Sequence, residues 1–195
     1  MAGIGFELRK ILKRDSLLAT LHAYAYATII GSGPWMLSMI GVAAIGGVTF
    51  VSTNPELYIS QFQITVTMVI CLSLILTGAI QVSFTRFISD RLFENNIAVV
   101  MPSYHGVMLA VTAGSGVIAL PVVLLGFAGQ TLFYKLLLLA LFVITCNIWI
   151  ATIFLSGLRQ YRAIVVLFAI GYGISVTCAL SLKPFKLEGL VLGFT

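Results

Sequence analysis

Residues 16–55 read SLLATLHAYAYATIIGSGPWMLSMIGVAAIGGVTFVSTNP, a stretch with no formally charged side chain. Further charge-free stretches cover 57–85, 95–134, 136–158 and 163–182, and the few charges lie in short clusters between them. A soluble domain carries about a quarter of its residues as charged side chains. This chain has 9% charged and 60% hydrophobic residues. The composition therefore predicts a protein that spans a membrane several times.

The spans are predicted to be helices. A helix needs about 20 apolar residues to cross a hydrocarbon core of about 30 Å, whereas a barrel strand shows about ten alternating residues. The long runs here do not alternate, and helices then satisfy every backbone group in lipid. We expect an all-α bundle of about six transmembrane helices. The predicted spans are 20–50, 62–82, 106–127, 131–154, 164–182 and a sixth from 187 onward.

The two ends of the chain differ from the middle. Residues 1–18 place apolar side chains at helical spacing among basic ones, which is typical of an amphipathic helix in the cytoplasmic membrane interface. Residues 19–195 form the predicted transmembrane bundle. The sixth span has too few residues to cross a bilayer before Thr195, so we expect the chain to be part of a longer transporter.

The lysines and arginines predict the orientation, because cytoplasmic loops are enriched in them. The N-terminal segment, the loop after the second span and the loop after the fourth span together hold Arg9, Lys10, Lys13, Arg14, Arg86, Arg91, Arg159 and Arg162. The opposite side holds Lys135, Lys183 and Lys186. The N-terminus is therefore predicted to be cytoplasmic, and the net charge of +5 reflects topology and lipid headgroups rather than nucleic acid.

Candidate substrate-pathway residues gather in the first span. His22 and Tyr26 lie four residues apart, on one helix face, and Tyr24 lies between them. Aromatic and hydroxyl groups suit sugar rings, although the tyrosines could equally belong to an interfacial aromatic belt. Ser32, Gly33 and Pro34 interrupt the same span, and a kink is expected near Pro34. The kink either eases packing or borders a substrate cavity.

Three candidates lie further along the chain. Gln81 and Arg86 lie near the cytoplasmic end of the second span, and Asn147 lies in the middle of the fourth. Asn147 could line a cavity or bond to a neighbouring helix. All six acidic residues lie outside the apolar cores or at their margins, so the sequence shows no intramembrane carboxylate that could couple transport to a cation. Either the coupling residues lie in another part of the transporter, or transport is driven by something other than a carboxylate-bound cation. The sequence predicts no catalytic residues, no metal ligands and no cofactor site.

Five short motifs stand out along the chain: MAGIGFELRK at 1–10, YAY at 24–26, GSGPW at 31–35, QVSFTRFISDR at 81–91 and FLSGLR at 154–159. Together they resemble the PelG family of exopolysaccharide exporters. The resemblance covers the whole chain, as the N-terminal portion of a longer protein. It implies the fold of the multidrug/oligosaccharidyl-lipid/polysaccharide flippase superfamily, in which two helical lobes enclose a central cavity. This chain would form most of the N-terminal lobe.

The resemblance also implies a function and partners. Members of the family lie in the bacterial inner membrane and are expected to export Pel, a galactosamine-rich polymer of the biofilm matrix, together with PelD, PelE and PelF. The partners implied are the polysaccharide, the membrane lipids and this synthase complex, with no nucleic acid. Two alternatives stay open: a lipid-linked oligosaccharide flippase, and a non-transporting scaffold that recruits a synthase through its basic loops. An enzymatic function is not expected.

Overall fold

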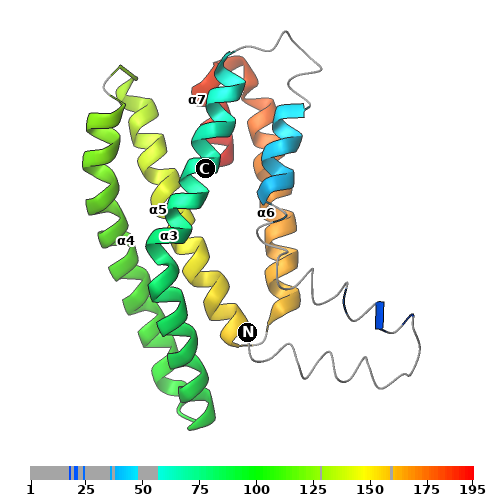
Figure 1. Ribbon diagram of the computed structural model, residues 1–195, viewed down its shortest axis with the longest axis vertical. Coiled ribbons are helices and arrows are strands. Elements are labelled where there is room, and N and C mark those ends of the chain that lie inside the picture. The colour runs from blue at the N-terminus through cyan, green and yellow to red at the C-terminus, as the bar shows by residue number, and fades with distance from the viewer. Residues whose placement is uncertain are drawn as a thin grey trace.

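The computed structural model describes residues 18, 20, 21, 24, 36, 38–47, 57–127, 129–158 and 160–195. Every regular element among these residues is a helix, and four of the helices are long and apolar enough to cross a membrane (Figure 1). The chain is therefore an all-α membrane bundle, as its composition predicts. The predicted kink at Pro34 and the amphipathic segment up to residue 17 lie outside the described residues.

Four long helices run up and down through the bundle. They are α3 (Leu57–Phe93), α4 (Val100–Gly126), α5 (Leu132–Gly157) and α6 (Tyr161–Ser181). The predicted spans 62–82, 106–127, 131–154 and 164–182 overlap them in that order. Because each residue adds about 1.5 Å, the 37 residues of α3 exceed the thickness of a hydrocarbon core. The excess turns of α3 carry Arg86, Asp90 and Arg91.

Short turns connect the long helices. Asn95 lies in the connection between α3 and α4. Its backbone has a left-handed φ of 56°, a conformation that asparagine tolerates better than most residues. The 3₁₀ helix η1 (Ile97–Val99) then leads into α4, which takes in Pro102 in its first turn. Proline is accepted there because a first-turn N–H has no intrahelical partner. The helix therefore begins earlier than the predicted span at 106.

Helix α5 lies at the centre of the arrangement. It packs along α3 and α4, and Figure 1 shows α3 crossing α5 while α4 and α6 flank the pair. The fully buried side chains of the two central helices include Phe62 and Ile88 of α3 and Cys146 and Ile150 of α5. The contacts between α5 and α6 are much sparser, so the two helices are held apart over part of their length.

Helix α6 instead packs closely against α7 (Lys186–Phe194), which follows the 3₁₀ helix η2 (Lys183–Phe185). Gly189 and Gly193 of α7 make the close approach possible. A Cβ at Gly189 would lie 2.0 Å from the Leu182 carbonyl oxygen, and one at Gly193 would lie 2.4 Å from the Ala179 nitrogen. Small residues four apart let helix backbones approach in this way.

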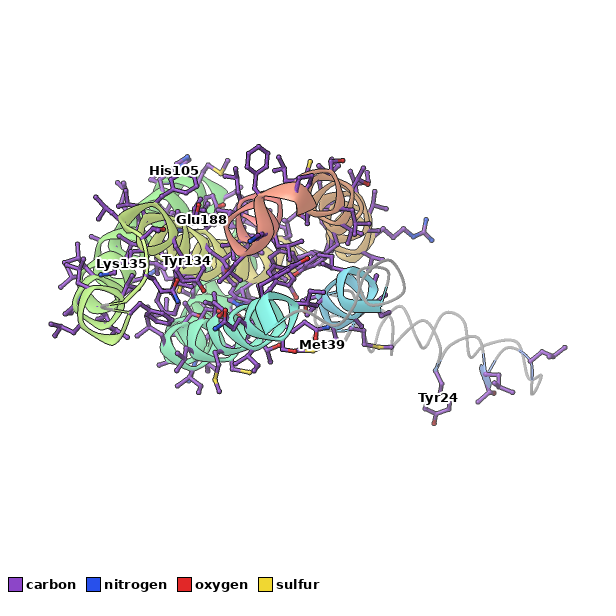
Figure 2. All side chains as sticks on the ribbon, turned by 90° about the horizontal axis from the view of Figure 1, so that it is seen from above. Tyr24, Met39, His105, Tyr134, Lys135 and Glu188 are labelled. Atoms are coloured by element: carbon purple, nitrogen blue, oxygen red, sulfur yellow. The ribbon has the colours of Figure 1, made fainter. Side chains whose placement is uncertain are left out.

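The start of α5 is tied to α7 by a polar link. Thr131 caps α5 by accepting a bond from the Tyr134 backbone N–H at 3.2 Å, and its hydroxyl donates to the Glu188 carboxylate. Figure 2, which looks along the bundle, labels Glu188 on α7 and Tyr134 and Lys135 on α5. A carboxylate near a helix N-terminus is favourable because it interacts with the positive end of the helix dipole. Glu188 therefore joins α7 to the start of α5, outside the apolar core.

Candidate functional site

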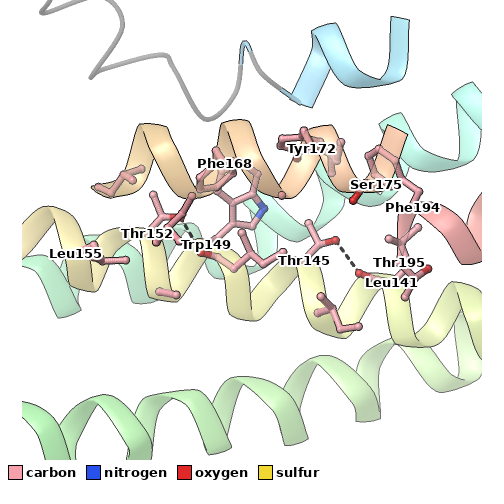
Figure 3. Close-up of a pocket in the computed structure, with 17 residues that line it drawn as sticks. Leu141, Thr145, Trp149, Thr152, Leu155, Phe168, Tyr172, Ser175, Phe194 and Thr195 are labelled. Carbon is pink, nitrogen blue, oxygen red and sulfur yellow. Dashed lines mark hydrogen bonds between the residues drawn. The ribbon is translucent and has the colours of Figure 1, made fainter. Parts of the chain in front are cut away.

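A cavity of about 280 Å³ lies between α5 and α6, where the two helices are held apart (Figure 3). Its walls are mostly apolar side chains, and α3 and α7 close it from behind and at one end. No charged side chain lines it among the described residues. The lining residues that carry polar atoms are Thr145, Trp149, Thr152, Tyr172, Ser175 and Thr195.

The three threonine hydroxyl groups in the cavity wall bond to backbone carbonyls of their own helices. Thr145 donates to the Leu141 carbonyl at 2.6 Å, and Thr152 donates to the Ile148 carbonyl at 2.7 Å. Thr195 bonds in the same way to Val191, at 2.8 Å. These bonds satisfy the threonine donors inside the helices, so the threonines add methyl groups and hydroxyl oxygens, but no free donors, to the wall.

Aromatic rings form a continuous row along the cavity. The centroids of Trp149 and Phe168 are 6.4 Å apart, and those of Phe168 and Tyr172 are 5.9 Å apart. Phe194 of α7 extends the row, 5.9 Å from Tyr172. The Tyr172 side chain is hydrogen-bonded to Ser38 of the short helix Ser38–Gly47, which therefore packs against α6. Successive rings are tilted by 33–45°, so the row forms an uneven aromatic surface over several turns of helix.

Trp149 is fixed in place by a bond across the bundle. Its indole N–H donates to the Ser73 hydroxyl at 2.9 Å, and that hydroxyl donates to the Ile70 carbonyl at 2.8 Å. Both side chains are buried. A buried indole N–H needs such a partner, because leaving it without one costs free energy in an apolar interior. The bond thus fixes the position of the indole ring in the cavity wall.

Ser73 is also the first member of a polar stripe along α3. The stripe continues with Thr77, Gln81, Thr85 and Ser89, each four residues further on. The Thr77 hydroxyl donates to the Ser73 carbonyl at 2.7 Å, and the Gln81 amide donates to the Thr77 hydroxyl at 2.8 Å. Thr85 and Ser89 each donate to the backbone carbonyl four residues earlier.

The stripe changes its exposure as it descends. Ser73 and Thr77 are fully buried, Gln81 and Thr85 are half-buried, and Ser89 is exposed. Steps of four residues advance by about 40° around a helix, so the stripe winds from the core to the surface. It emerges at the end of α3 that carries Arg86 and Arg91. The stripe thus connects the Trp149 contact with the basic end of the bundle along one side of α3.

Two basic residues, Arg86 and Arg91, lie near the C-terminal end of α3. Arg86 is exposed, and Arg91 pairs with Glu94 and lies over the Phe87 ring at 5.3 Å from its centroid. Both arginines belong to the group of eight basic residues that the sequence predicts to be cytoplasmic.

A comparison with known protein families gives one match. The family model PelG, described as "Putative exopolysaccharide Exporter (EPS-E)", matches residues 1–195. This chain belongs to the PelG family. The match confirms the family resemblance of the sequence motifs, and the family is one of transporters rather than enzymes. The comparison with curated proteins and the comparison with solved structures returned no match.

The structure describes four of the nine candidate residues proposed for this PelG-family chain. Gln81 lies in the α3 stripe, and Arg86 lies near its exposed end. Tyr24 is 67% exposed and lies away from α3–α7 in Figure 2. None of these residues lines the cavity between α5 and α6. The remaining candidates His22, Tyr26, Ser32, Gly33 and Pro34 lie outside the described residues.

Asn147, the fourth described candidate, joins two helices. Its amide oxygen accepts a bond from the Thr112 hydroxyl of α4 at 3.2 Å, and its amide nitrogen donates to the Val143 carbonyl at 2.8 Å. Asn147 is absent from the residues that line the cavity. Of the two roles that the sequence left open for it, the geometry favours the contact between helices.

Sequence reasoning about the PelG-family chain missed Ser73, Thr77 and Trp149. A signal for the stripe exists, because Ser73, Thr77 and Gln81 repeat at four-residue spacing within an otherwise apolar helix. No comparable signal marks Trp149. Its importance arises from a partner 76 residues away in the chain.

Proposed function

We propose that this protein exports an exopolysaccharide outward across the bacterial cytoplasmic membrane. The observation that carries the proposal is the family match over residues 1–195. The proposed cargo is Pel, a galactosamine-rich polymer of the biofilm matrix. The all-α membrane bundle agrees with this function, since moving a polar polymer through lipid requires a protein path with polar groups.

The α3 stripe supports a saccharide path in particular. Hydroxyl groups that donate to backbone carbonyls keep oxygen lone pairs that accept bonds from sugar hydroxyls or amides. Gln81 uses one N–H on Thr77 and has a second N–H and a carbonyl oxygen for other partners. Such sites bind weakly and repeat along the helix, which suits a polymer that must slide rather than stay bound. We therefore assign Gln81 and Thr85 to the path.

The basic end of the bundle supports an orientation and a partner. Placing Arg86, Arg91 and Arg162 in the cytoplasm follows the enrichment of basic residues in cytoplasmic loops. The polymer would then enter at the exposed end of the stripe. We propose that the synthase complex of PelD, PelE and PelF contacts the protein at this end and delivers the growing polymer there.

The test is secretion of polysaccharide by a strain that lacks the gene. Restoring the natural gene should restore secreted polymer, and Gln81→Leu should restore it several-fold less well, at equal protein level. Gln61→Leu is the matched control, because Gln61 is an exposed glutamine of α3 outside the stripe. Normal secretion by the deletion strain would contradict the export function. Equal secretion by both variants would instead remove Gln81 from the path.

The same strain separates export from lipid-linked flipping. An exporter of free polymer leaves no lipid-linked saccharide when it is deleted. Accumulation of a lipid-linked oligosaccharide in the deletion strain would favour the flippase alternative.

A further inference from the structure

We infer that the cavity between α5 and α6 binds one acyl chain of a membrane phospholipid. The inference concerns a different feature from the α3 stripe and does not depend on the cargo that the protein exports. It rests on the shape of the cavity, on the chemistry of its wall and on the surroundings of the two helices.

The cavity is elongated along the helices. Its α5 wall extends from Leu141 to Leu155, and its α6 wall extends from Ile164 to Ser175. At about 1.5 Å per residue these walls are about 21 Å and about 17 Å long. Each leaflet contributes about 15 Å to the hydrocarbon core. An acyl chain that lies parallel to the helices therefore matches the cavity in length.

The wall chemistry favours an apolar occupant, because eleven of the seventeen lining residues carry no polar side-chain atom and none is charged. Thr145 and Thr152 direct their donors to backbone carbonyls, and the Trp149 N–H bonds to Ser73 outside the cavity. A water molecule is retained in a cavity when it finds two to four polar partners, and apolar cavities remain dry. A sugar ring would find few partners for its hydroxyl groups there, because the acceptors that remain are the separate hydroxyl oxygens of Thr145, Thr152, Tyr172, Ser175 and Thr195. Methylene groups lose nothing on entry.

The surroundings supply the occupant. The cavity lies between α5 and α6, two of the helices that are long and apolar enough to cross the membrane. An empty cavity would forfeit the dispersion contacts of Phe168, Leu167 and Ile148, whereas an acyl chain restores them. Because lipid tails surround these helices, they are the apolar molecules nearest at hand. The chain would also bridge α5 and α6, which touch each other sparsely.

Two glycines of α6 provide a matched pair of test sites. A Cβ at Gly171 or at Gly173 would meet no atom within 4 Å, so both positions accept a larger side chain. Only Gly171 lines the cavity. Gly171→Leu therefore fills the cavity, while Gly173→Leu adds the same side chain outside it. Ala151→Leu fills the cavity from the α5 wall and serves as a second filling variant.

Trp149 provides the readout, because its indole lines the cavity. The chain has two tryptophans, so Trp35→Phe leaves Trp149 as the only one. The protein with this background is placed in vesicles of phosphatidylcholine with brominated acyl chains, and quenching of Trp149 fluorescence is compared with that in unbrominated vesicles. Bromine quenches at short range, so an acyl chain in the cavity should quench strongly.

The expected result is strong quenching in the parent and in Gly173→Leu, with quenching lowered about twofold or more in both filling variants as the chain is displaced. Equal quenching in all variants, or weak quenching in the parent, would overturn the inference. Strong quenching by aqueous acrylamide in place of bromolipid would overturn it as well, since the cavity would then hold water. The quenching experiment does not measure polymer secretion. A negative result would therefore overturn lipid binding in the cavity without contradicting the export proposal.

Discussion

Trp149 of α5 donates its indole N–H to the Ser73 hydroxyl of α3 at 2.9 Å, where α3 and α5 pack together. The bond joins the polar stripe of α3 to the wall of the cavity. The indole ring forms part of the cavity wall between α5 and α6, and Ser73 begins the polar stripe of α3. A change at either residue should therefore affect both features.

Ser73→Ala should destabilise the protein by about 0.5–1.5 kcal/mol, because it leaves the buried Trp149 N–H without a partner. Unfolding of the detergent-solubilised protein, followed by Trp149 fluorescence in the Trp35→Phe background, measures the change. Ser89→Ala is the control, since this exposed hydroxyl of the same helix bonds only to its own backbone. Equal stability of the two variants would show that the Trp149–Ser73 bond contributes nothing measurable.

Gly193→Ala should destabilise the hairpin of α6 and α7. The added Cβ would lie 2.4–2.7 Å from backbone atoms of Ala179 and Cys178, and backbone cannot move aside as a side chain does. Overpacking of this kind costs about 1–3 kcal/mol. Thermal unfolding in detergent measures it, and Gly173→Ala, where a Cβ meets nothing within 4 Å, is the control. A wild-type unfolding midpoint for Gly193→Ala would contradict the close packing.

Asn147→Leu should weaken the contact of α4 and α5 without impairing export. Bonds between membrane helices contribute about 0.6 kcal/mol on average and about 1.7 kcal/mol at most. A double-mutant cycle with Thr112→Val should show coupling of that size, because the two side chains bond to each other. Additive effects of the two changes would argue against the bond. A large loss of secreted polymer with unchanged stability would place Asn147 in the polymer path instead.

The orientation is open to labelling. In a protein whose native cysteines Cys71, Cys146 and Cys178 are replaced by alanine, Asn96→Cys and Gln130→Cys introduce thiols at exposed sites of opposite ends of α4. The excess of basic residues near Asn96 predicts a cytoplasmic location for it. A membrane-impermeant maleimide should then label only Gln130→Cys in intact spheroplasts, and both variants after permeabilisation. The opposite pattern would reverse the topology.

The sequence by itself determined that this protein is an all-α membrane bundle. Charge-free stretches long enough to cross a bilayer leave helices as the structure that satisfies the backbone in lipid. The motifs at 1–10, 31–35 and 81–91 were sufficient to indicate the family that the whole-chain match shows. The sequence also singled out Gln81 as a candidate, because it is a polar residue near the end of an apolar span, and the structure places it in the α3 stripe.

Only the tertiary structure decided which face of each helix is buried. On α3, Ile88 is fully buried whereas Ile75 is 77% exposed, although the two side chains are identical. In water a polar face would mark the outside of a helix, but lipid tails are as apolar as a helix interface, so the pattern carries no such mark. The Trp149–Ser73 bond, the close approach at Gly193 and the cavity all follow from how the helices cross. Their partners lie far apart in the chain, and local sequence does not encode a crossing.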